Sequence, residues 1–172
     1  KWKFLMSVFS NIEPNRILHK GKHFFLIKDG YPVSPGHILI ISNKEKIDYF
    51  ELDPYERVEL TELIVKAKEI IEDDAWKLLG SIVTTEFDVL EVIDKETGYM
   101  RTAWQVEGFN GSTIRTRVIV KLGDSNPLKY VMKISSERAE GAVSVKDDQD
   151  FEEWSRILKK YKNIIEEAQS RL

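Results

Sequence analysis

Apolar residues in the first quarter of the chain form three short runs, which predict three β-strands. The runs cover residues 17–19, 23–27 and 38–41 and consist mainly of Ile, Leu and Phe. Lys20-Gly21-Lys22 separates the first two runs and is typical of a hairpin turn. Residues 29–37, before the third run, contain two prolines and two glycines, which predict a stiff, irregular loop. We therefore expect a short β-meander with one irregular connection.

A helix is expected to begin after this meander. Asp53 is a favourable N-cap, Pro54 suits the first helical position, and Glu56 stands three residues after the cap, as in a capping box. Apolar residues then recur at helical spacing and predict one buried face. They are Leu60, Leu63, Ile64, Ala67, Ile70 and Ile71.

The pattern changes character at Asp73-Asp74. Apolar residues keep a helical spacing from Ala75 to Val83, and the two acidic residues are well placed to cap and start a new helix. The alternative is that the preceding helix simply continues. The sequence leaves both interpretations open.

Alternating apolar and polar residues then predict four strands joined by short turns. The expected strands cover residues 87–93, 100–106, 114–122 and 130–134, and the polar residues 135–150 are expected to form a loop. Strands connected in this way favour an antiparallel meander with one face in water.

Residues 151–172 predict a long C-terminal helix with a continuous apolar stripe, for which the apolar face of the sheet is the expected partner. The expected fold class is therefore α+β, with a four-stranded antiparallel sheet packed by this helix. The stripe consists of Phe151, Trp154, Ile157, Leu158, Tyr161, Ile164, Ile165, Ala168 and Leu172.

Composition and charge narrow the functional classes. The chain has 172 residues, of which 42% are apolar, and its 26 basic and 29 acidic residues give a net charge of −3. This balance does not favour nucleic acid or anionic membranes as partners, and no window approaches the roughly 20 apolar residues of a membrane span. The chain has no cysteine, which excludes disulfides and thiolate nucleophiles.

The apolar run at residues 4–9 is too short for a signal-peptide core and is expected to belong to the folded domain.

Basic residues recur on the expected polar face of the second meander. One interpretation is a basic patch, and the favoured one is a set of solvated strand charges, because Glu91 and Glu107 can interleave with them. The basic residues are Arg101, Arg115, Arg117 and Lys121.

The loop at residues 29–37, with the sequence DGYPVSPGH, points most directly to a ligand. With FSNI at residues 9–12 and the strand at 38–41, it resembles the N-terminal half of histidine-triad (HIT) nucleotide-binding proteins. The resemblance covers about residues 4–72 and implies a purine nucleotide as ligand.

The same resemblance assigns expected roles to four residues. Phe9 and Ile12 would line the base pocket. Asp29 would accept hydrogen bonds from the ribose hydroxyls, and His37 would support the catalytic histidines from behind. A carboxylate held by a stiff loop at the end of a strand is suited to two vicinal hydroxyls.

The catalytic strand of that family is not recognisable in this chain. The signature is three histidines alternating with apolar residues, whereas the histidines here are His19, His23 and His37, with no pair spaced by two. We therefore favour a non-enzymatic function and expect no cofactor. Asp29 is about as well explained as a turn former, and His37 is favoured as structural. His19 and His23 have a metal-ligand spacing for a helix, but Gly21 favours a hairpin in which they need not converge, so no metal site is expected.

The second half resembles another family. Residues 74–80 (DAWKLLG), 87–94 (FDVLEVID) and 97–104 (TGYMRTAW) resemble the repeated domain of BamC-type outer-membrane assembly lipoproteins. The resemblance covers about residues 73–172 and implies a helix-grip α+β module that binds protein and has no catalytic residues. No lipidation cysteine accompanies it.

These observations predict two domains, a HIT-like half module at residues 1–72 and a BamC-like helix-grip module at residues 73–172. The favoured function is a non-catalytic binding or assembly module with a vestigial nucleotide-binding loop, acting with a protein partner. The alternative is a HIT-family nucleotide-binding protein or nucleotidyl hydrolase or transferase.

The resemblance to HIT proteins implies a cytoplasmic protein and the resemblance to BamC-type domains a periplasmic one, so the compartment stays open. Half a HIT module would leave an exposed sheet edge, and we expect the second module, or a second subunit in a homodimer, to cover it.

Overall fold

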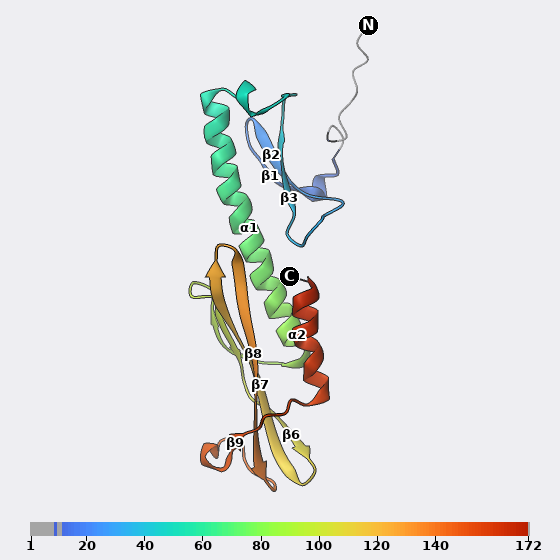
Figure 1. The fold of residues 1–172 in the computed structure, drawn as a ribbon, viewed down its shortest axis with the longest axis vertical. Coiled ribbons are helices and arrows are strands. Elements are labelled where there is room, and N and C mark those ends of the chain that lie inside the picture. Colours follow the sequence, from blue (N-terminus) through green and yellow to red (C-terminus); the bar gives the residue numbers. More distant parts are fainter. Residues whose placement is uncertain (1–8, 10–11, 172) are drawn as a thin grey trace. The chain divides into compact units, whose positions relative to one another are not determined.

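A computed structural model describes residue 9 and residues 12–171 (Figure 1). The described chain is α+β, as expected, with two α-helices and two antiparallel sheets. It divides into two compact units, Lys1–Asp74 and Ala75–Leu172, called unit 1 and unit 2 below. No helix of the described part is long and apolar enough to cross a membrane.

Unit 1 contains a three-stranded antiparallel sheet in the order β1-β2-β3. The strands are β1 (Ile17–Lys20), β2 (Phe24–Lys28) and β3 (Ile38–Ser42), and they confirm the three predicted runs. Phe24, Leu26 and Ile27 of β2 are buried, and the first two, which stand two residues apart, share one face of the strand. Together with residues from the helix and from the segment before it, these two form the core of unit 1. Its buried members are Phe24, Leu26, Leu52, Leu63 and Ala67.

Helix α1 (Pro54–Glu86) begins with the predicted capping box. The Glu56 backbone N–H donates to Asp53 Oδ1 at 2.9 Å, and the Asp53 N–H donates back to Glu56 Oε2 at 2.9 Å. Lys46 Nζ adds a 2.9 Å hydrogen bond to the same Glu56 oxygen. The Asp53 N–H and then Lys46 therefore lower the pKa of Glu56, because both stabilise the ionised carboxylate.

The helix does not restart at Asp73-Asp74. Helix α1 is continuous over 33 residues and extends from unit 1 into unit 2. No proline follows Pro54 within it, and its first glycine is Gly80, so nothing in the backbone chemistry stops the helix near residue 73. The continuation interpretation is the correct one.

Unit 2 contains six strands, so the prediction of a four-stranded sheet was wrong. They are β4 (Leu90–Asp94), β5 (Tyr99–Thr102), β6 (Gln105–Phe109), β7 (Ser112–Ser125), β8 (Leu128–Glu140) and β9 (Glu152–Glu153). Their order is β4-β5-β7-β8-β9, and β6 also pairs with β7.

The extra strands are β6 and β9, and β9 pairs with the end of β8 at Glu137 and Arg138. The run at residues 100–106 is interrupted at Ala103-Trp104, and its two parts, β5 and β6, pair with different lengths of the long strand β7. Strand β8 continues to Glu140 through residues that were expected to form a loop, because its backbone pairs with β7 along its whole length. Polar side chains do not prevent a strand when the neighbouring strand supplies the hydrogen bonds.

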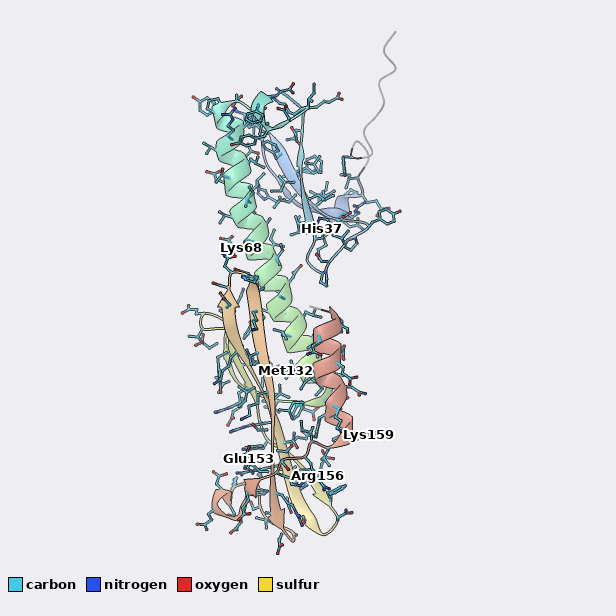
Figure 2. All side chains as sticks on the ribbon, in the orientation of Figure 1. His37, Lys68, Met132, Glu153, Arg156 and Lys159 are labelled. Atoms are coloured by element: carbon cyan, nitrogen blue, oxygen red, sulfur yellow. The ribbon has the colours of Figure 1, made fainter. Side chains whose placement is uncertain are left out.

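Helix α2 is shorter than predicted and covers only Lys159–Arg171. Figure 2 shows Glu153 and Arg156 on the segment that leads to α2, whose first residue is Lys159. The helical spacing before residue 159 was misleading because other contacts compete for those residues. Phe151 covers the Arg115 guanidinium at 4.1 Å, and the Trp154 N–H donates to the Ser136 carbonyl at 2.9 Å.

The core of unit 2 joins α1, α2 and one face of the sheet, so the expected packing of the C-terminal helix on the sheet is confirmed. Phe87 and Tyr161 stack with ring centroids 4.8 Å apart. The buried members of this core are Trp76, Leu79, Ile82, Val83, Phe87, Met100, Val118, Val120, Ile134, Tyr161, Ile164 and Ala168.

Candidate functional site

The loop between β2 and β3, residues 29–37, is the candidate ligand site. Its two ends are joined, because the Asp29 N–H donates to the His37 carbonyl at 3.2 Å. Gly36 has a φ of 75°, and a Cβ there would lie 3.1 Å from the Ile71 side chain, so glycine is required on both counts. The loop exposes Tyr31 and Val33, and His37 closes it just before β3 (Figure 2).

Asp29 is held in one orientation by two neighbours. Its Oδ1 accepts a hydrogen bond from the Tyr31 backbone N–H at 3.1 Å. Its Oδ2 lies 3.0 Å from the buried ring nitrogen Nδ1 of His37, which forms no aligned hydrogen bond. The Asp29 side chain is 17% exposed and that of His37 is 33% exposed. The carboxylate is thus fixed but still reachable from solvent.

Asp29 makes the contact expected of a turn residue, and its carboxylate still has acceptor positions for a ligand. The bond to Tyr31 is the local contact that an aspartate makes in a turn. A carboxylate has about four acceptor positions on its two oxygens, so each oxygen of Asp29 keeps one beyond its present neighbour. Two vicinal hydroxyl groups would match these two positions.

Arg16 is a neighbour of this site that the sequence analysis missed. Its Nε and Nη2 atoms donate to the Lys28 carbonyl at 3.3 and 3.0 Å. A Cβ on Gly30 would lie 3.1 Å from Nη2 and 3.3 Å from both Cζ and Nη1 of Arg16. These nearly equal distances mean that the flat face of the guanidinium covers Gly30. Nothing in the sequence marks this contact, which joins residues 14 positions apart across β1 and β2.

Phe9 and Ile12, the residues expected to line a base pocket, are at the edge of the described chain. Phe9 is 37% exposed and Ile12 is half-buried. Neither belongs to the core of unit 1. Their role toward a nucleotide base stays a prediction.

His23 and His37 lie beside different acidic groups. His23 Nδ1 is 3.9 Å from Glu56 Oε1, whereas His37 is beside Asp29. The His23 and Phe24 backbone N–H groups donate to Glu59 of α1, which fixes the β1–β2 hairpin that Gly21 predicted. Within residues 9 and 12–171, no three His, Asp or Glu side chains converge where they could hold a metal ion.

Not all of the basic residues on the strands of unit 2 are exposed to water. Arg101 does pair with Glu91, at 3.1 Å, but Arg115 is only 4% exposed, so the solvated interpretation is wrong for Arg115. Glu107 was expected to interleave with these residues, yet it accepts hydrogen bonds from Lys160 and Tyr161 of α2 instead.

Arg115 is buried between aromatic rings and oxygen acceptors. Its guanidinium lies 4.6 Å from the Trp104 centroid and 4.1 Å from that of Phe151. It donates to Glu137 Oε2 at 2.7 Å, to Asp148 Oδ1 at 2.5 Å and to the Val145 carbonyl at 2.8 Å. With all these partners, Arg115 serves packing and is not available to a ligand.

No protein-family model, curated protein or solved structure matches this chain. The resemblances to HIT proteins and to BamC-type domains therefore stay predictions that rest on the motifs quoted above.

Proposed function

We propose that the protein is a non-catalytic binding or assembly module and that its loop at residues 29–37 binds a purine nucleotide through the ribose. The observation that carries the proposal is the Asp29 carboxylate, which is fixed by Tyr31 and His37 and keeps an acceptor position on each oxygen. A fixed carboxylate binds two vicinal hydroxyls with little loss of side-chain entropy.

Binding is favoured over catalysis because, among residues 9 and 12–171, the histidine beside this carboxylate is His37, whose ring nitrogen faces the carboxylate itself. A nucleotidyl hydrolase or transferase of the HIT type needs a histidine that can attack a phosphate, with neighbours that manage protons. His37 faces Asp29, and His23 faces Glu56 at 3.9 Å. The assembly part of the proposal, with a protein partner, rests on the resemblance of residues 73–172 to BamC-type domains.

Thermal unfolding with and without AMP or GMP tests the nucleotide part. A ligand that binds only the native state stabilises it by about 2.7 kcal/mol at 100 times its Kd. We expect both nucleotides to raise the Tm of the wild-type protein, and Asp29→Ala to abolish the rise.

Asp48→Ala is the matched control. Asp48 accepts a hydrogen bond from the Phe50 N–H at 2.8 Å, the same local contact that Asp29 makes with Tyr31, but outside the loop. It should lower Tm and leave the rise with nucleotide intact. If neither nucleotide raises the Tm of the wild-type protein, the nucleotide part of the proposal is wrong.

A further inference from the structure

We infer that Arg16 is the phosphate-binding residue of this site, so that the preferred ligand is a nucleotide rather than a nucleoside. The inference rests on the proposed function, because it takes Asp29 as the ribose ligand. It is carried by the placement of the Arg16 guanidinium beside the loop.

Arg16 is positioned before any ligand arrives. Two of its nitrogens donate to the Lys28 carbonyl, and its flat face covers Gly30. A guanidinium has five N–H donors, and those that point away from Lys28 remain for an anion. Because its orientation is already fixed, binding costs little side-chain entropy.

The charge of Arg16 is not neutralised by an acidic partner. It forms no ion pair with any carboxylate in the part of the chain that the structure describes. Arg101, Arg115 and Arg171, by contrast, each pair with a glutamate. Lys28, the nearest basic residue in sequence to the loop, is paired with Asp74 at 3.4 Å. Arg16 is thus a half-buried cation whose charge is open to an anion.

In this inference, Arg16 takes the phosphate and Asp29 takes the ribose of one 5′-nucleotide. Gly30, which Arg16 covers, directly follows Asp29 in the chain. In a 5′-nucleotide, the phosphate hangs from C5′ on the ring face opposite to the 2′ and 3′ hydroxyls, so the residues that bind the two groups must lie apart from each other and not side by side. Arginine presents parallel N–H donors that match two oxygens of one phosphate. The carboxylate would select the sugar, and the guanidinium would select the phosphate.

Isothermal titration of the full chain with adenosine and with AMP tests the inference. We expect AMP to bind about tenfold more tightly than adenosine, the effect of one charge-assisted contact at a partly exposed site. Arg16→Gln should bring the Kd of AMP to that of adenosine and leave the Kd of adenosine unchanged. Asp29→Asn should weaken both ligands. Lys20→Gln, which removes an exposed cation from the strand that follows Arg16, β1, should change neither.

The outcomes separate this inference from the proposed function. If adenosine and AMP bind the wild-type protein equally, or if Arg16→Gln keeps the preference for AMP, Arg16 does not bind phosphate and the ribose site stands. If neither ligand binds the wild-type protein, the proposed function and this inference both fail. Arg16→Lys is the control for misfolding of the Arg16→Gln protein. It keeps the positive charge and should retain part of the preference for AMP over adenosine. Loss of the whole preference in a folded Arg16→Lys protein would contradict a charge-based role.

Discussion

Arg115→Ala should be among the most destabilising single substitutions in unit 2. The hydrogen bonds to Glu137, whose side chain is 26% exposed, are partly shielded from water and are worth about 1.5–3 kcal/mol. The contact with Asp148 is worth at most about 1 kcal/mol, because that side chain is 81% exposed and water screens the pair. The rings of Trp104 and Phe151 add about 1–2 kcal/mol of cation–π attraction. We therefore expect a loss of about 3–5 kcal/mol in the free energy of unfolding, in line with the removal of one partner of a buried ion pair.

Urea unfolding followed by tryptophan fluorescence measures this loss. Three of the four tryptophans, Trp76, Trp104 and Trp154, belong to unit 2, so most of the signal follows that unit. With a denaturant slope of about 2 kcal/mol per molar urea, the midpoint should fall by roughly 1.5–2.5 M. Arg115→Lys should recover little, because an ammonium cannot reproduce the planar fork or stack between two rings.

Arg101→Ala is the control for this measurement. Arg101 belongs to the same sheet and pairs with Glu91, but the two side chains are 31% and 51% exposed. Exposed pairs contribute about 0–1 kcal/mol, so the midpoint should barely move. If the two alanine variants shift the midpoint equally, burial does not determine the strength of these contacts and the reasoning is wrong.

Two further predictions concern a tight turn and a buried tyrosine. Gly21→Ala should destabilise unit 1 by about 1–3 kcal/mol in urea unfolding, because the new Cβ would displace Glu59 from the His23 and Phe24 N–H groups. Gly108→Ala is the control and should be neutral, because no atom lies close to the position of its Cβ. Burial, followed by the hydrogen bond to Glu107, raises the pKa of Tyr161 from 10.0 to about 12. Its neutral form therefore stabilises the fold fully below pH 10, and this contribution is lost as the pH rises toward 12. An ultraviolet titration should show a last tyrosine step that Tyr161→Phe removes, and a Tyr161→Phe titration that keeps this step would contradict the assignment.

The sequence predicted the elements whose signals are local. The capping box of α1 needs only Asp53 and Glu56, three residues apart, and both of its hydrogen bonds form. The strands of unit 1 are short apolar runs between turn residues, and they form where those runs predicted them. In these cases the interacting groups are neighbours in the chain, so spacing alone contains the necessary information.

The errors arose where distant partners decide the structure. Residues 135–140 are polar, but β7 supplies their backbone partners, and they extend β8. Phe151 and Trp154 have helical spacing with the residues of α2, yet Phe151 packs on Arg115, 36 positions earlier, and Trp154 bonds to Ser136. Tertiary contacts of this kind override local propensity.

The same distinction explains which site residues were found. Asp29 and His37 are eight positions apart at the two ends of one loop, so their pairing follows from the loop itself. Arg16 reaches the loop only because β1 pairs with β2, and its value to a ligand depends on the absence of a carboxylate partner, which no local pattern encodes. Arg115 appeared similar to Arg16 in sequence, as a basic residue on or beside a strand, but its charge is already satisfied by Glu137 and Asp148. The capacity of a cation to bind a ligand therefore depends on which acids the fold places beside it, and this is why Arg16, and not Arg115, is the residue to test.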